Sequence, residues 1–155
     1  MMTNLEPILA EHPFSKGLNP EYLQLIVGCA SNVRFEARQQ IYRAGEEANT
    51  FYIIRTGRVS VELFVPGRGN VTLETLGEGD VLGWSWIFPP YTWHFDARAV
   101  ELTRATALDG KCLRSKCEAD PAFGFELIKR VSHMLMHRLH ATRLQVLDVY
   151  GTKRT

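Results

Sequence analysis

The sequence predicts a mainly β fold: a double-stranded, jelly-roll-like β-roll flanked by helices. Between residues 33 and 110, short runs rich in Val, Ile, Phe and Tyr alternate with glycine and proline turns, which is typical of consecutive strands. The segments before and after this stretch carry apolar side chains at helical spacing. We therefore expect N-terminal helices within 1–32, a roll over 33–110 and a long helix over 120–150, all in a single domain of residues 1–155.

The helix boundaries follow from local signals. Apolar spacing predicts two short helices, over residues 5–10 and 20–30, the second with Asn19 as N-cap and Pro20 at its first position. Within the roll, a Thr-Gly turn separates two strand-like runs in "FYIIRTGRVSVELFV", and "PGRGN" predicts a hairpin loop before "VTLETL". The long helix is expected to start after Asp120, again with a proline at the first helical position.

The long helix carries an apolar stripe with alternate spacings of three and four, which predicts a partner helix. The stripe consists of Ile128, Val131, Leu135, Leu139, Thr142, Val146 and Val149. We expect a homodimer with an interface formed by Val131, Leu135, Leu139, Thr142 and Val146. The alternative is a helix that lies flat on its own domain without a dimer.

Bulk composition describes an ordinary globular domain. Hydrophobic residues make up 45% and charged residues 23%, and the net charge of +1 offers no strong field to a nucleic acid. The sequence predicts no secretory signal and no membrane-spanning run, so we expect a cytoplasmic protein without membrane contacts. The three cysteines, Cys29, Cys112 and Cys117, are an odd number without zinc-site spacing and are expected to be reduced thiols.

Residues 12–110, with the long helix as a continuation, resemble the cyclic-nucleotide-binding domains of the catabolite-activator/FNR (Crp/Fnr) family. The resemblance rests on the helical entry after "HPFSKGL", the "IYRAGEE" turn and the strand "FYIIRTGRVSV". Glycines at positions 45, 57, 79 and 83 match the turn glycines of the family. The resemblance implies a β-roll that holds a small effector and a long final helix that forms a dimer.

The segment "GDVLGWSWIFPPYTWHF", residues 79–95, occupies the position of the family's phosphate-binding motif. In the family this motif provides a Glu for the ribose and an Arg for the cyclic phosphate, with backbone N–H groups at a helix N-terminus. Here Trp84 replaces the Glu and His94 replaces the Arg. Cyclic AMP is therefore expected to bind weakly, or not at all, in the manner of the family.

Two hypotheses account for the aromatic residues of this segment. They either fill the roll as core, which is the more frequent role of aromatic side chains, or they form a cup for a different ligand. The retained Gly83 turn keeps the second hypothesis open. No cofactor is predicted with certainty; the effector would be a cyclic nucleotide or another small molecule, and the residues expected at its position are Gly83, Trp84, Ser85, Trp86, His94, Phe95 and Arg98.

Other candidate sites are weaker. His133, His137 and His140 share a helix face at a spacing that suits a metal, but no carboxylate or cysteine supports them, so no metal site is predicted. Cysteines near the N-terminus, the iron–sulfur ligands of some FNR-type sensors, do not occur. No nucleophile elbow, P-loop or HExxH motif is present, so an enzyme is not predicted.

Three functions remain from these observations. The first is a stand-alone sensor or regulatory module that acts on an unknown partner protein and does not bind DNA, because the chain stops at "YGTKRT" without a helix-turn-helix. The second is a structural adaptor with a plugged pocket. The third is a β-roll enzyme of the cupin type, which is disfavoured because His94 is the single histidine between residues 33 and 110.

Overall fold

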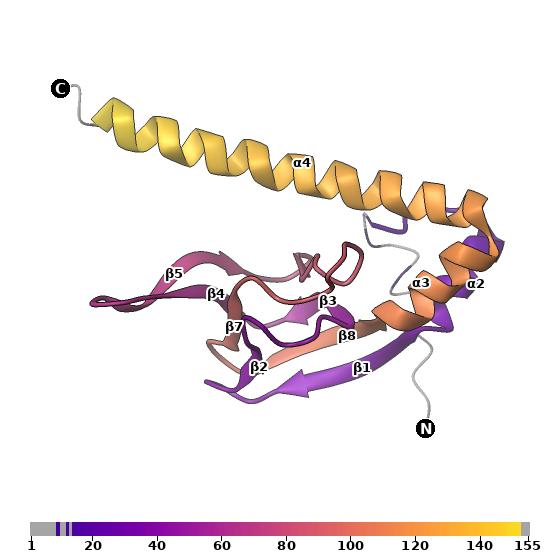
Figure 1. Ribbon diagram of the computed structural model, residues 1–155, viewed down its shortest axis with the longest axis horizontal. Coiled ribbons are helices and arrows are strands. Elements are labelled where there is room, and N and C mark those ends of the chain that lie inside the picture. Colours follow the sequence, from indigo (N-terminus) through magenta and orange to yellow (C-terminus); the bar gives the residue numbers. More distant parts are fainter. Residues whose placement is uncertain (1–8, 10–11, 13, 153–155) are drawn as a thin grey trace.

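The β-roll consists of two antiparallel sheets (Figure 1). This computed structural model describes residues 9, 12 and 14–152, and for residues 145, 146 and 148–152 it describes the backbone only. Within that part of the chain, eight strands form two four-stranded sheets. The strands are β1 (Ala30–Phe35), β2 (Gln40–Tyr42), β3 (Thr50–Thr56), β4 (Val59–Val65), β5 (Gly69–Leu76), β6 (Val81–Leu82), β7 (Asp96–Ala99) and β8 (Thr103–Asp109). The mainly β prediction is confirmed.

The strand order shows how the roll is wound. One sheet has the order β1-β8-β3-β6 and the other the order β2-β7-β4-β5. β4 and β5 form the predicted hairpin, with Val65 opposite Gly69. The turn at Gly57, by contrast, carries the chain from one sheet to the other, because β3 and β4 belong to different sheets. Gly57 has φ +102, and a Cβ there would lie 2.6 Å from the carbonyl oxygen of Leu102, so only glycine fits this crossing.

Helices pack at one end of the roll and along one side. α2 (Pro20–Val27) starts as predicted, with the Asn19 side chain accepting a hydrogen bond from the backbone N–H of Glu21. It ends three residues before the predicted boundary, because the chain enters β1 at Ala30. The helix expected over 5–10 lies outside the described residues, apart from Leu9.

A helix that the sequence analysis did not predict, α3 (Gly110–Ala119), follows β8 directly. Asp109 caps it by accepting a hydrogen bond from the backbone N–H of Cys112 at 3.1 Å. Its sequence "GKCLRSKCEA" carries few apolar residues, so periodicity gave little signal. α3 joins the roll to the long helix α4 (Pro121–Thr152), whose predicted start after Asp120 is confirmed.

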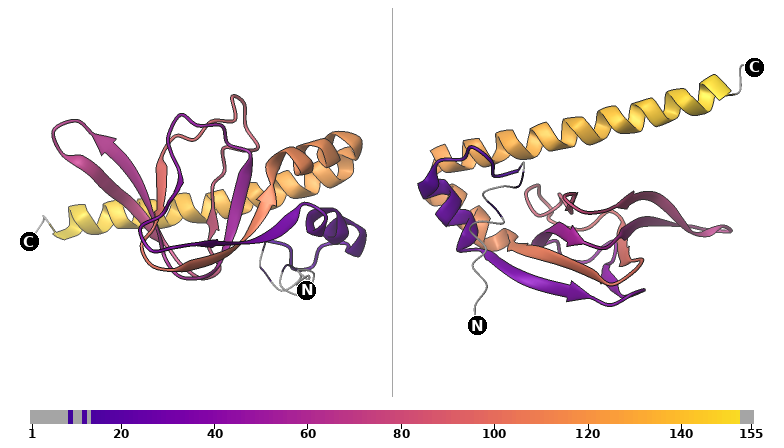
Figure 2. Two further views of the ribbon diagram at one scale, coloured as in Figure 1. Left: turned by 90° about the horizontal axis from the view of Figure 1, so that it is seen from below. Right: turned by 180° about the vertical axis from the view of Figure 1, so that it is seen from behind.

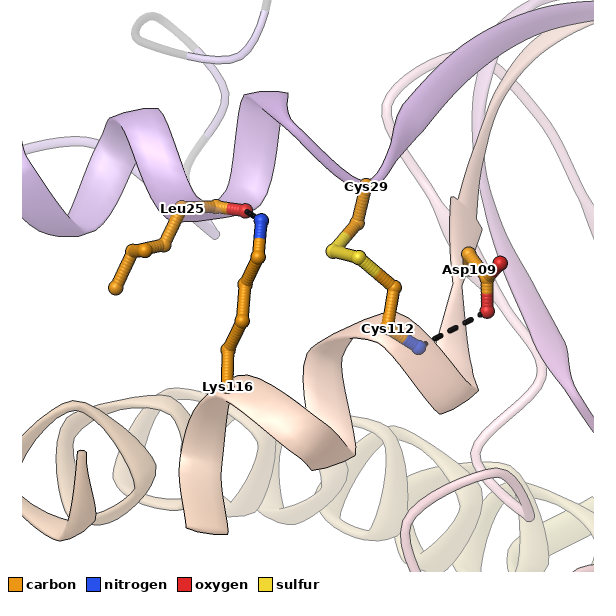
Figure 3. Close-up of a disulfide and its surroundings, with 5 residues drawn as sticks. All are labelled: Leu25, Cys29, Asp109, Cys112 and Lys116. Atoms are coloured by element: carbon orange, nitrogen blue, oxygen red, sulfur yellow. Dashed lines mark hydrogen bonds between the residues drawn. A yellow bond between two sulfur atoms is a disulfide. The ribbon is translucent and has the colours of Figure 1, made fainter. Parts of the chain in front are cut away.

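The expectation of reduced thiols is wrong for two of the three cysteines. Cys29 and Cys112 form a disulfide that joins the end of the α2 segment to the first turn of α3, with Cα atoms 5.8 Å apart (Figure 3). The two residues are 83 positions apart in sequence, and α3, which brings them together, was not foreseen. Cys117 remains a free thiol, and burial raises its pKa.

α4 begins beside α3 and extends from there along one side of the roll, as both views of Figure 2 show. Near its start, the Arg130 guanidinium donates hydrogen bonds to the carbonyl oxygens of Phe14 and Lys16 at 3.0 and 2.9 Å. Phe123, Leu127 and Val131 are each 1% exposed in the core. α4 is thus anchored to its own domain by its N-terminal half.

This anchoring changes the expected dimer stripe. Val131 lies in the core of its own domain, and Leu135 is half-buried against the same core. The side chain of Val146 lies outside the described residues. The apolar side chains of α4 that remain exposed lie on a neighbouring face, and those the structure describes are Phe125, Ile128, Met136, Leu139, Leu144 and Leu147.

Candidate functional site: a cavity between the roll and the long helix

The segment that follows β6 begins with a tight turn at Gly83. This glycine has φ +94, and a Cβ at its position would lie 2.7 Å from the indole ring of Trp93. A side chain at position 83 would therefore displace that ring. After Gly83 the described chain forms turns and bends through to Trp93 instead of a helix, so the helix N-terminus that holds phosphate in the family motif does not form here.

The three tryptophans of this segment have different environments. Trp86 is fully buried and stacks on Phe51, with ring centroids 4.6 Å apart. Trp93 is 6% exposed and stacks on Tyr42 at 3.8 Å. Trp84 is half-buried, and its indole Nε1 is buried without a hydrogen-bond partner among the described residues. Trp86 is therefore core, whereas Trp84 and the buried Trp93 both border open space.

That open space is a cavity of about 330 Å³ between the roll and α4. Its size is at the lower end of the range for small-molecule sites. The roll, the 82–95 segment and α4 all contribute to its walls, which are formed by Tyr42, Val61, Glu74, Leu82, Gly83, Trp84, Ser85, Trp93, His94, Phe95, Leu135, Arg138, Leu139 and Thr142. The aromatic side chains of this segment thus divide between the two hypotheses: Trp86 fills the core, and Trp84, Trp93 and Phe95 line a cavity.

Arg138 places a positive charge in this cavity. Its guanidinium donates a hydrogen bond from Nη1 to the carbonyl oxygen of Val81 at 3.0 Å and forms an ion pair from Nη2 to Glu74 Oε1 at 2.5 Å. The guanidinium carbon lies 6.0 Å from the centroid of the Trp84 ring, at the limit of a cation–π contact. Arg138 therefore joins α4 to β5 and to the start of the aromatic segment.

Five of the seven residues expected at the ligand position line this cavity, and two do not. Gly83, Trp84, Ser85, His94 and Phe95 form part of its wall. Trp86 lies in the core, and Arg98 lies outside the cavity wall.

Arg98 has a different partner. Its Nη2 lies 2.6 Å from Glu62 Oε2, a carboxylate that is only 4% exposed and also accepts a hydrogen bond from Ser60 Oγ at 3.0 Å. Burial of a carboxylate is costly without such charge-assisted contacts. Arg98, whose side chain is 43% exposed, is therefore already paired with a buried carboxylate of β4.

Sequence reasoning missed the α4 side of the cavity. Leu135, Leu139 and Thr142 were expected in a dimer interface, yet all three line the cavity. The sequence offered one indication of this wall, because Arg138 is a positively charged residue beside the apolar stripe. Whether this residue faces a cavity depends on how α4 packs against β5, and no local pattern reveals that packing.

The structure gives no support to a metal site at the histidines of α4. His133 and His137 lie close together, with ring centroids 5.0 Å apart, and His140 is exposed. Among the described residues, no group of three or more His, Cys, Asp or Glu side chains is placed to hold a metal ion. Over the same residues, each helix is too short or too polar to cross a membrane.

Burial also perturbs the tyrosines of the roll. Tyr42, which stacks on Trp93 in the cavity wall, has its pKa raised mainly by desolvation. The pKa of Tyr52 is raised by the same effect. Both phenols are therefore neutral over the physiological pH range and can contribute to the site only as uncharged groups.

Comparison with known proteins agrees with this architecture. The family model of the cyclic nucleotide-binding domain matches residues 32–120. A curated relative, the CRP-like cAMP-activated global transcriptional regulator of Mycobacterium tuberculosis (strain ATCC 25618 / H37Rv), is 27% identical over 149 residues. That alignment covers 96% of this chain but 64% of the relative, so the chain spans less than two thirds of the relative's length.

Solved structures show the same fold. A putative cyclic nucleotide-binding protein from Geobacter metallireducens GS-15 has a TM-score of 0.78 at 24% identity, covering 90% of this chain and all of the other. A cyclic nucleotide-binding domain from Methylobacillus flagellatus KT has a TM-score of 0.80 at 16% identity, covering 94% of this chain and 85% of the other. With the family match over more than half of its length, the chain belongs to the cyclic nucleotide-binding domain family.

Proposed function

We propose that this chain is a sensor module that binds a small anionic effector in the cavity between the roll and α4. The effector is a cyclic nucleotide or a related molecule that combines a planar ring with a negative charge. The observation that carries the proposal is Arg138, a cation held at a cavity whose other walls combine aromatic rings with aliphatic side chains. The mycobacterial relative is named as a cAMP-activated regulator, which supports the same class of effector.

The ion pair between Arg138 and Glu74 suggests how binding would proceed. The Glu74 side chain is 46% exposed, so its carboxylate can return to water at little cost. A ligand phosphate or carboxylate could replace it, because guanidinium groups bind both anions through similar charge-assisted hydrogen bonds. Binding would then exchange one carboxylate for another anion at the point where α4 meets β5.

The output of the module is proposed to pass through a homodimer. Six exposed apolar side chains on α4 form a face that a second copy of the same helix would cover, and Ile128, Met136 and Leu139 are 40%, 62% and 51% exposed. Leu139 also lines the cavity, so this face adjoins the effector site. A change at the cavity would then act directly on the dimer contact.

We further propose that the module is cytoplasmic and regulates a partner protein rather than DNA. The net charge of +1 supports this, since nucleic-acid binding depends on neutralising many phosphates. The curated relative is a cAMP-activated transcriptional regulator, and the two solved structures are described as a cyclic nucleotide-binding protein and a cyclic nucleotide-binding domain, which favours a sensor over an enzyme.

Calorimetry with a panel of cyclic mononucleotides and linear nucleotides tests this proposal. We expect binding by the unmodified chain, and binding about ten- to hundredfold weaker in Arg138→Gln, because one charge-assisted contact is lost. Glu74→Gln removes the competing carboxylate and should tighten binding. Arg143→Gln, an exposed arginine on the same helix, is the matched control and should leave the affinity unchanged.

Two results would contradict the proposal. If no member of the panel binds, the chain is a structural adaptor whose cavity has no nucleotide ligand. If a nucleotide binds equally well to the unmodified chain and to Arg138→Gln, the cavity recognises its ligand without Arg138.

A further inference from the structure

The disulfide between Cys29 and Cys112 lies at a junction of three helices. Cys29 follows α2 directly, and Cys112 is in the first turn of α3, as Figure 3 shows. One turn later on α3, Lys116 Nζ donates a hydrogen bond to the carbonyl oxygen of Leu25 at 2.7 Å. α3 is thus held against α2 by one covalent link and one hydrogen bond.

The opposite side of α3 is in contact with the aromatic segment of the cavity. A Cβ added at Gly110 would lie 2.9 Å from the Cβ of Trp86, so the start of α3 touches this segment directly. Arg114 donates a hydrogen bond to the carbonyl oxygen of Trp86, and its guanidinium lies 4.2 Å from the centroid of the Tyr91 ring. A displacement of α3 would therefore move the loop from Trp84 to Tyr91.

α3 also determines where α4 begins. The backbone N–H of Asp120 donates to the carbonyl oxygen of Lys116 at 2.9 Å, and Gly124 of α4 packs against Cys117, with its Cβ position 3.1 Å from the cysteine Cβ. α4 carries Arg138, on the other wall of the cavity. α3 accordingly lies between the disulfide and both walls of the effector site.

The disulfide is also accessible from the surface. Cys112 is half-buried, and Cys29, although 7% exposed, lines a surface hollow of about 330 Å³ together with Ser31 and Asp109. Disulfides of proteins in reducing compartments are usually redox-sensing or catalytic instead of structural. The cytoplasmic location proposed above would make the redox state of this pair variable.

We propose that Cys29–Cys112 is a redox-active disulfide, exchanged by a dithiol reductant, whose state sets the position of α3 and thereby the shape of the effector cavity. One thiolate of the reductant attacks Sγ of Cys112, the more exposed of the two residues, and the Cys29 sulfur leaves as a thiolate and takes up a proton. The second reductant thiol then releases Cys112, so the protein gains two electrons and two protons while the reductant becomes a disulfide. The link to effector affinity and the encounter with a cellular reductant rest on the proposed function and location, whereas the movement of the loop on reduction does not.

Thiol counting on the full chain tests the exchange step. The oxidised protein has three cysteines, of which the structure pairs two, so one thiol should react before treatment and three after treatment with dithiothreitol. Circular dichroism should show that the reduced protein remains folded. A disulfide that resists reduction in the folded chain, or a chain that unfolds when reduced, would show that the bond is only a structural staple and would overturn the proposal.

Hydrogen exchange on the same two states tests the coupling, without any ligand. Reduction should accelerate exchange in the segment from Trp84 to Tyr91 by about three- to tenfold. In Arg114→Gln this response should be weakened, because the contacts to Trp86 and Tyr91 are lost. Lys111→Gln, an exposed residue of the same helix with the same change in charge, is the matched control and should respond like the unmodified chain.

The outcomes separate this inference from the proposed function. An unchanged loop after complete reduction would overturn the inference, whether or not any nucleotide binds. A loop that responds in a chain that binds no nucleotide would support the inference and contradict the proposed effector. Cys117→Ser, which leaves the disulfide intact, should show no reactive thiol before reduction and two after it, and should respond like the unmodified chain in hydrogen exchange. A loss of the exchange response in that variant would also overturn the proposal.

Discussion

At the scale of single residues, the cavity wall depends on a glycine that lets an aromatic ring pack directly against the backbone. Gly83 lies against the edge of Trp93, and Trp93 in turn stacks on Tyr42. The sequence indicated this glycine as a turn and this segment as the ligand position. It could not indicate that Trp86 is core while Trp84 and Trp93 line the cavity, because this depends on contacts with strands that are distant in sequence.

Replacing Gly83 by alanine should destabilise the fold by about 2–4 kcal/mol, from a strained positive φ and a collision with the Trp93 ring. Gly67→Ala is the matched control, since Gly67 has φ +84 but nothing within 4 Å of its Cβ position. That control should lose only about 1–2 kcal/mol. Urea unfolding of the three proteins measures the difference, and equal losses in both variants would refute the close contact.

The neutral phenol of Tyr42 predicts a loss of stability at alkaline pH. Because burial raises its pKa, the unfolded chain ionises this tyrosine near pH 10 while the folded chain keeps it protonated. The free energy of unfolding should therefore fall by about 1.4 kcal/mol per pH unit above pH 10 from this group. Tyr42→Phe should reduce that slope, as measured by urea unfolding between pH 9 and 11; an unchanged slope would show that Tyr42 does not carry the effect.

At the scale of the elements, α4 has a buried face and an exposed apolar face. The buried face holds Phe123, Leu127 and Val131 in the core, and the exposed face is the one proposed for the dimer. The sequence analysis combined residues of both faces in one stripe, because a helix that is apolar on several sides has no unique direction. Contacts with the roll and with the N-terminal segment, which are distant in sequence, decide which face turns inward.

The proposed dimer should depend on Ile128 and Met136, which are exposed on α4 and do not line the cavity. Changing both to glutamate would place like charges across a two-fold contact, so the pair of chains should dissociate to monomers. Light scattering measures the mass. Ala141→Glu, at an exposed position about 140° around the helix from both Ile128 and Met136, should remain dimeric. A monomeric unmodified chain at micromolar concentration would refute the dimer.

α3 and the disulfide show where an element escapes sequence reasoning. The succession of strands, the turn glycines and the capped start of α4 have local signals, and these predictions are confirmed. α3 is short and mostly polar, so its periodicity is weak. Without α3, nothing in the sequence brings Cys29 near Cys112, and the odd number of cysteines favoured free thiols.

At the scale of the whole molecule, the predicted order of helices, strands and a long helix is confirmed, and with it the family. The cavity was expected inside the roll, but the structure places α4 as one of its walls. Arg138 shows why the sequence could not predict this wall: the residue is held at the cavity by a contact with Glu74, which is 64 positions away in sequence. Long-range packing of this kind determines the site, whereas local patterns determine the elements.

The length of α4 gives the contact at Arg138 a mechanical consequence. The helix continues to Thr152, fourteen residues further on, which corresponds to about 21 Å at 1.5 Å per residue. Treated as a rigid rod that pivots at the buried Val131, the helix would move by about 0.9 Å at Arg138 and by about 2.7 Å at Thr152 for a tilt of about 5°. In the proposed exchange of one anion for another at the guanidinium, a small shift of Arg138 would thus be amplified about threefold at the far end of the helix, which is enough to change how two surfaces fit together.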